Sequence, residues 1–172
     1  MSSYRLLVIS DVSGSDHDSI CPVLGSKYLS LVLPLIEKAK ISIDIAAYSW
    51  TFKDWERNNS ITIFTKAIMK ARKRGVAVRV VLNSESRSHY LTISNKRTIK
   101  KISSVGIEAK MGRSSPITHC KMILVDNVYT VIGSHNLTGR SVTSNDETSI
   151  IIKGRSVNKI YKDYFLAIWR RP

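Results

Sequence analysis

The segment Val76–Leu82 (VAVRVVL) limits the possible folds more than any other part of the chain. It is a near-continuous β-branched run, and it follows a helical pattern over Ile61–Arg74 that ends at Gly75, a favourable C-terminal cap. Runs of this kind are typical of strands that are buried on both faces of a parallel sheet. The segment therefore predicts an α/β protein.

The other patterns along the chain also alternate between strands and helices. Asp11–Gly25 is rich in Ser, Asp and Gly and predicts a loop, and Asp126-Asn127 predicts a two-residue hairpin turn. Strands are predicted at Tyr4–Ser10, Ile41–Tyr48, Ile107–Met111, Thr118–Val125, Val128–Gly133 and Glu147–Ile152, and helices at Lys27–Lys40, Thr92–Ser104 and Val157–Trp169. This order predicts a mixed, largely parallel β-sheet with helices on both faces, in a single domain over residues 1–172.

The charge of the chain predicts its partners. Lys and Arg number 27 against 13 Asp and Glu, which gives a formal net charge of +14. The stretch from Lys70 to Arg113 holds twelve basic residues, opposed only by Glu85 and Glu108. Such an excess attracts polyanions, so we expect a nucleic acid as the first candidate partner and an anionic membrane as the second.

Several classes of protein are disfavoured. The two cysteines, Cys21 and Cys120, are too few for a disulfide framework, and no His/Cys spacing typical of a structural zinc site is present. No apolar stretch approaches the roughly 20 residues that span a bilayer. The first residues lack the apolar core of a secretory signal, so we expect a cytoplasmic protein.

Side-chain alternation brings five polar residues together. In the predicted strand over Thr118–Val125, His119 and Lys121 are two residues apart and share a face. Ser134 and Asn136 share a face in the segment beyond the hairpin, and Glu147 begins the following strand. These residue types suit phosphate chemistry: lysine offers a positive charge, serine and asparagine donate hydrogen bonds, and histidine acts as a nucleophile or proton donor.

The spacing of these residues resembles a family signature. His119-Cys120-Lys121, four residues, Asp126, six residues and Gly133-Ser134-His135-Asn136 match the H-x-K-x4-D-x6-G-S-x-N motif of the phospholipase D superfamily. The position of Glu147 matches the acidic residue that follows this motif. The resemblance implies that His119 attacks phosphorus and forms a phosphohistidine. Lys121, Asn136 and Ser134 would hold the phosphate, Glu147 would orient His119, and Asp126 would complete the set more as a structural than a chemical partner. No metal ion or other cofactor is implied.

Only one copy of the motif is present. His17, His89 and His135 are not followed by lysine two residues later, so the resemblance is to the short, single-motif members that pair as two-fold dimers. In such a homodimer, His119 of each subunit would lie on either side of one phosphate. One histidine would attack, and the other would protonate the leaving oxygen.

Weaker candidates and alternatives remain open. Arg113 and Trp50 are candidate substrate contacts, the latter with Tyr48 and Ser49 at the end of a predicted strand, although packing in the core or a dimer is the commoner role of a tryptophan. Alternation turns His135 and Cys120 away from the site. The sequence predicts a metal-independent nuclease that acts on DNA or RNA. The alternatives are a phospholipase D or phosphatidyltransferase acting on anionic phospholipid, and a non-catalytic nucleic-acid-binding module.

Overall fold

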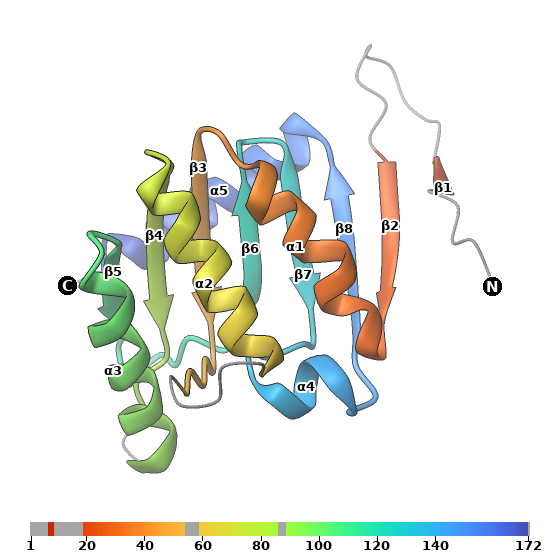
Figure 1. The fold of residues 1–172 in the computed structure, drawn as a ribbon. Coiled ribbons are helices and arrows are strands. Elements are labelled where there is room, and N and C mark those ends of the chain that lie inside the picture. The colour runs from red at the N-terminus through yellow and green to blue at the C-terminus, as the bar shows by residue number, and fades with distance from the viewer. Residues whose placement is uncertain (1–6, 9–18, 54–58, 86–88, 172) are drawn as a thin grey trace.

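The computed structural model describes residues 7–8, 19–53, 59–85 and 89–171. The strands of this part form one sheet in the order β1-β2-β8-β7-β6-β3-β4-β5 (Figure 1). The strands are β1 (Leu7–Val8), β2 (Ser19–Leu24), β3 (Ser42–Ala47), β4 (Ala77–Leu82), β5 (Glu108–Met111), β6 (Lys121–Val125), β7 (Tyr129–Gly133) and β8 (Thr148–Lys153). The helices are a 3-10 turn, η1 (Gly25–Lys27), then α1 (Tyr28–Lys38), α2 (Ser60–Lys73), α3 (His89–Ser103), α4 (Gly139–Thr143) and α5 (Arg155–Trp169).

Helices cover both faces of this sheet. In Figure 1, α1, α2 and α3 lie in front of the sheet and α5 lies behind it, while α4 lies at the lower edge. The predicted mixed α/β architecture with helices on both faces is therefore confirmed. The helices in the described part of the chain are all too short or too polar to cross a bilayer.

The balance of strand directions differs from the prediction of a largely parallel sheet. Among the described strands, only β3, β4 and β5 run parallel to one another, and all other neighbours are antiparallel. The reason lies in the connections. Helices α2 and α3 supply the crossovers that parallel strands need, whereas β6 and β7 are joined by a tight turn that allows only antiparallel pairing. The buried parallel strand predicted over 76–82 is β4, with a parallel neighbour on each side.

The prediction of a loop over residues 11–25 is wrong for its second half. Residues 19–24 form β2, which pairs with β8 along its whole length. Pro22 and the polar residues before it interrupt the alternating apolar pattern by which a strand is recognised in a sequence. The strand is tolerated because Pro22 lies beyond the two residues of β2 that pair with β1, so no described ladder needs its missing N–H on that side. Of the strand predicted over 4–10, only Leu7 and Val8 lie within the described residues, and they form β1.

The two faces of the sheet have separate cores. On the side of α1 and α2, Ile36, Ile45, Phe64 and Ile123 are buried within a large apolar cluster. On the side of α5, a smaller cluster forms around Phe165 and Ile168, with side chains from β3, β4 and β6 beneath them. Successive residues of β3 alternate between these clusters, as expected for a strand with both faces covered.

A buried charge lies under α5. Asp44 of β3 is 1% exposed, and its carboxylate accepts a hydrogen bond from Arg79 Nε at 2.7 Å and a second from Lys162 Nζ of α5. The Arg79 guanidinium also lies over the rings of Phe165 and Trp169, at 5.4 and 5.9 Å from their centroids. Asp44 therefore links the sheet to α5 through two cations.

Removal of this carboxylate is expected to destabilise the fold. Asp44→Ala leaves two partly buried cations without their partner, and loss of one member of such a group costs about 3–5 kcal/mol. Asp163→Ala is the matched control, because Asp163 forms an exposed i,i+4 pair with Lys159 and should change stability little. Urea unfolding of both variants measures the difference, and equal midpoints would contradict the assigned role of Asp44.

Candidate active site

Of the predicted site residues, His119 and Lys121 lie where β3 ends and β6 begins, and Ser134 and Asn136 follow the end of the neighbouring strand β7, at the lower edge of the sheet in Figure 1. Lys121 is the first residue of β6 and pairs with Ala47 at the end of β3. His119 precedes the strand, and the N–H of Tyr48 donates to the carbonyl of Cys120 at 2.9 Å. The chain therefore holds the exposed His119 in a backbone-paired extension of the sheet.

His119 and Lys121 are in contact, as their spacing predicts. Lys121 Nζ lies 3.2 Å from each ring nitrogen of His119 and donates to the His119 carbonyl at 2.9 Å. The Tyr48 ring meets the imidazole edge-on, with centroids 4.6 Å apart, and Lys121 Nζ lies 5.1 Å from the Tyr48 centroid. Burial lowers the pKa of Lys121, an effect that nearby Cys120 and Glu147 oppose. The site therefore joins an exposed imidazole to a partly desolvated amine.

The loop after β7 is held by a network around Glu147. Ser134 Oγ donates to one carboxylate oxygen of Glu147 at 2.5 Å, and Ser141 Oγ donates to the other at 2.8 Å. Ser141 Oγ in turn accepts the backbone N–H of Asn136 at 2.8 Å. The Asn136 Oδ1 atom is buried and has no hydrogen-bond partner in the described part of the chain. The network positions Asn136 through its backbone and leaves this oxygen of its amide without a protein partner.

In this structure, the Glu147 carboxylate therefore stabilises the loop after β7. Partial burial raises its pKa, but hydrogen bonds from Ser134, Ser141 and Asn145, with a smaller electrostatic contribution from His135, lower the pKa below its ordinary value. Its described hydrogen bonds go to these three side chains, and none of them reaches His119. Ser141 and Asn145 were not predicted, because no spacing rule distinguishes them from other polar loop residues.

Gly133 shows why the motif needs a glycine at this point. A Cβ added there would lie 2.1 Å from Ser149 Oγ and 2.4 Å from the carbonyl oxygen of Thr148. The neighbouring strand β8 therefore approaches too closely for any side chain. This approach allows the N–H of Ser134 to donate to Thr148 at 2.8 Å and directs the chain toward Asn136.

Asp126, which the motif includes in the predicted catalytic set, lies at the opposite end of β6 from His119. Its carboxylate accepts the backbone N–H groups of Lys40, Ile41 and Ser42 at 2.7–3.0 Å. Asp126 and Asn127 have φ values of 55° and 57°, as the central residues of a type I′ turn require. This position removes Asp126 from the predicted catalytic set and agrees with the structural role that the resemblance implied, and the predicted turn is found at these residues.

The prediction that Trp50 contacts substrate is also wrong. Trp50 is fully buried, its indole N–H donates to Thr65 Oγ1 at 3.0 Å, and its ring packs against Phe64. Its large apolar surface is buried in the core, so no face is available for a base. Arg113 is exposed and lines a small hollow with Thr118, next to His119 in the chain, and its contact with substrate stays a prediction.

His135 and Cys120 face away from the site, as alternation predicts. The buried His135 ring bonds to Ser149 Oγ at 2.7 Å and to the Gly25 carbonyl at 3.0 Å, and it stacks on Tyr28. Cys120 is half-buried on the side of α5, and burial raises the pKa of its thiol. Neither side chain is placed to assist His119.

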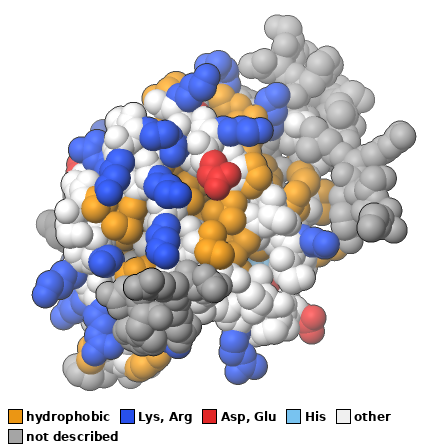
Figure 2. Space-filling view, in the orientation of Figure 1, with side chains coloured by type: hydrophobic (Ala, Val, Ile, Leu, Met, Phe, Trp, Pro, Cys, Tyr) orange, Lys and Arg blue, Asp and Glu red, His pale blue; other side chains and the backbone are white. Residues whose placement is uncertain are grey.

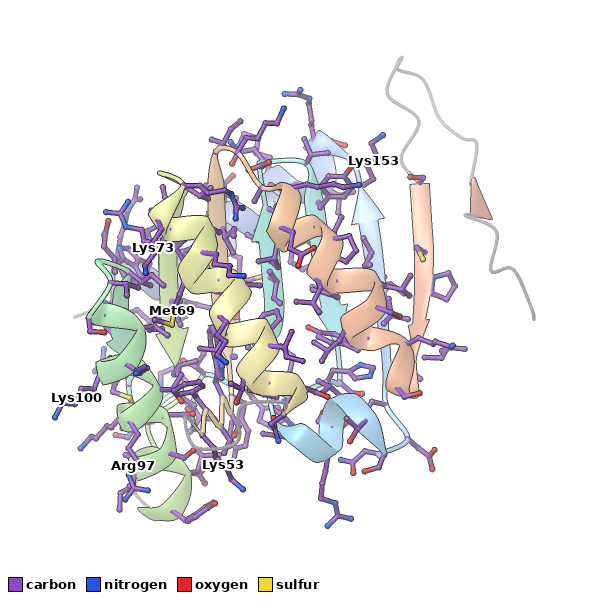
Figure 3. The ribbon with its side chains drawn as sticks, in the orientation of Figure 1. Lys53, Met69, Lys73, Arg97, Lys100 and Lys153 are labelled. Atoms are coloured by element: carbon purple, nitrogen blue, oxygen red, sulfur yellow. The ribbon has the colours of Figure 1, made fainter. Side chains whose placement is uncertain are left out.

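Basic side chains cover the face formed by α1, α2 and α3. Figure 2 shows Lys and Arg spread over this face with few acidic groups among them. Figure 3 places Lys73 toward one end of it, and Lys53 and Arg97 toward the end where β3 and β4 finish. The basic stretch noted in the sequence therefore extends toward the candidate site.

The chain belongs to the phospholipase D superfamily, a superfamily of phosphodiesterases. A family model described as "Cardiolipin synthase, PLD-like domain" matches residues 32–169. The crystal structure of a phospholipase D family member, Nuc from Salmonella typhimurium, superposes with a TM-score of 0.74 and 29% identity, covering 89% of this chain and 95% of that one. Fold and sequence therefore support the same family.

Two similar curated proteins bear names that point to different substrates. The mitochondrial cardiolipin hydrolase of Danio rerio is 30% identical over 141 residues, which is 81% of this chain and 56% of that protein. The virion nicking-joining enzyme of Vaccinia virus (strain Western Reserve) is 29% identical over 117 residues, which is 64% of this chain and 26% of that protein. The chain thus spans about half, or less, of the length of these relatives.

Glu147 provides a test through the pH dependence of stability. Its folded pKa lies below the ordinary 4.5, so its charged form stabilises the fold above that pH, and this contribution disappears as the pH falls through the folded pKa. Glu147→Gln should therefore be less stable than wild type at pH 7, and the gap should close toward pH 3. Urea midpoints at both pH values measure this. Glu37→Gln, at an exposed position of α1, is the control, and an equal gap at both pH values would contradict the network.

Proposed function

We propose that this chain is a metal-independent nuclease that cleaves DNA or RNA through a phosphohistidine on His119. The observation that carries the proposal is the contact between the exposed His119 and Lys121. The Glu147 network fixes the backbone of Asn136 through Ser141. An imidazole next to a fixed amine suits attack on a phosphodiester, because the ammonium neutralises the nonbridging oxygens while the ring nitrogen approaches phosphorus.

The proposed reaction has two steps. A ring nitrogen of His119 attacks phosphorus, the bond to the leaving oxygen breaks, and a proton donor supplies that oxygen with its proton. Water then attacks phosphorus, the phosphorus–nitrogen bond breaks and restores His119, and the proton donor of the first step takes up the proton that the water loses. Lys121 and the Asn136 amide stabilise the charge on the phosphoryl oxygens in both steps.

The proton donor is proposed to be His119 of a second copy of the chain. Besides His119, the structure describes the side chain of one histidine, His135. Its ring is buried and bonded to Ser149 and Gly25, so it is not placed to donate this proton. A two-fold homodimer places identical groups on either side of one phosphate. One active site would then form across the axis from two equal halves.

Two features favour a nucleic acid over a lipid as the substrate. The basic face runs toward the site (Figures 2 and 3), and a polyanion can follow such a face over several phosphates. The similar Nuc and nicking-joining proteins also bear names typical of nucleic-acid enzymes. Hydrolysis of anionic phospholipid is the second candidate, which the name of the cardiolipin hydrolase supports.

The nuclease proposal predicts cleavage in the presence of chelator. Wild-type protein with EDTA should cleave at least one substrate in a panel of single- and double-stranded DNA and RNA, and His119→Ala should lower the rate by about a thousandfold or more because the nucleophile is lost. Activity that disappears with EDTA and returns with Mg²⁺ would contradict the mechanism. Vesicles with anionic phospholipid form the parallel arm, in which cleavage of lipid but of no oligonucleotide would favour the second candidate.

The shared site predicts a dominant effect of inactive subunits. Wild type and His119→Ala are co-expressed with different tags in equal amounts, and the mixed population is assayed. If both histidines are needed, only dimers of two wild-type subunits are active. Random pairing makes these about one quarter of all dimers, so the activity of the mixture should be about one quarter of that of wild type rather than about one half. Sedimentation analysis measures the dimer, and activity that falls only in proportion to the wild-type fraction would contradict a shared site.

A further inference from the structure

A polar groove opens beside the candidate active site. Its volume is about 460 Å³, and it lies between the segment after β3, the start of α2 and the short helix α4. Thr51 and Lys53 form one wall, Ser60 begins the second, and Arg140 and Thr143 of α4 form the third. None of the motif residues lines this groove, so the chemistry at His119 does not account for it.

The groove is continuous with the site through two neighbouring segments. Beyond β3, the backbone of residues 49–51 pairs with Leu137: Leu137 donates to the Ser49 carbonyl at 3.0 Å, and Thr51 donates to the Leu137 carbonyl at 2.9 Å. Tyr48, which touches His119, is three residues from Thr51 of the groove. Three extended residues span about 10 Å, which is within the reach of the nucleotides adjoining a bound phosphate.

Two exposed side chains of the groove have the chemistry of a nucleotide contact. Arg140 is exposed, and its guanidinium has no hydrogen bond or ion pair within the described part of the chain. Tyr90, in the first turn of α3, is 77% exposed, which is unusual for so large an apolar ring. Arginine binds phosphate oxygens in a fork, and an aromatic ring stacks on a base of any sequence.

The lining residues of the groove suit a phosphodiester strand. Apart from the Tyr90 ring, the groove is lined by hydroxyl, amide and cationic groups and by Gly139, with no aliphatic side chain among its lining residues. The hydroxyl, amide and cationic groups of this surface offer hydrogen-bond and charge partners to a phosphodiester strand. Lys53 of the groove and Arg97 of the basic face lie toward the same end of the molecule (Figure 3), so a strand can pass from one to the other.

We propose that this groove binds the nucleotides that flank the scissile phosphate, with Arg140 on a neighbouring phosphate and Tyr90 stacked on a base. The proposal rests on the proposed nuclease function. It predicts that the groove contributes to the binding of oligonucleotides but not to that of a small diester, bis(p-nitrophenyl) phosphate, which has no flanking nucleotides.

The test compares two substrates in matched variants. The measured quantity is the ratio of kcat/KM for an oligonucleotide to kcat/KM for bis(p-nitrophenyl) phosphate. Tyr90→Ala and Arg140→Ala are each expected to lower this ratio by about tenfold, which is the contribution of one stacking or one charged contact. Tyr90→Phe should restore the ratio, because the ring is kept. Arg155→Ala removes the same charge from an exposed position at the start of α5 and should leave the ratio near the wild-type value.

A second measurement separates binding from folding and from chemistry. In the His119→Ala background, fluorescence anisotropy of a labelled oligonucleotide should show the same tenfold weakening for Tyr90→Ala and Arg140→Ala. If wild type cleaves nucleic acid but neither variant changes the ratio or the affinity, the groove proposal is overturned and the nuclease proposal stands. If wild type hydrolyses the small diester but no nucleic acid, both are overturned.

Discussion

The carboxylate of Asp126 secures the geometry on which the candidate site depends. By accepting three successive backbone N–H groups at the start of β3, it fixes the β6–β7 hairpin against that strand at one end. Because side chains alternate along a strand, a shift of one residue would turn the whole of β6 over. The register set at Asp126 therefore determines that His119 and Lys121 meet Tyr48 at the other end.

A second constraint acts on the loop that carries Asn136. Close approach of β8 at Gly133 and the hydrogen bonds of Glu147 with Ser134 and Ser141 bring this loop to the same edge. The result is a site in which Lys121 contacts His119, while Glu147 and Ser141 fix the loop of Asn136. Electrostatic catalysis benefits from this arrangement, because groups that are fixed beforehand need little reorganisation during the reaction.

Much of this could be predicted from the sequence because the signals are local. The β-branched run of β4, the helix ending at Gly75 and the Asp126-Asn127 turn each follow from neighbouring residues, and all are found. The strand β2 was missed because Pro22 breaks its pattern, and because its pairing with β8, which is distant in the chain, is not visible in the sequence. Trp50 was misassigned because its position at a strand end is visible in sequence, whereas the pocket formed by Phe64 and Thr65 is not.

By itself, the sequence determined the family, the residues of the motif and the strong positive charge, since these depend only on residue types and their spacing. Only the tertiary structure decided that Asp126 acts far from His119, that Glu147 holds a loop, and that Tyr90 and Arg140 share a groove. The physical reason is that these roles arise from contacts between segments distant in the chain. Spacing predicts which side chains share a face, but strand order and register decide which faces meet.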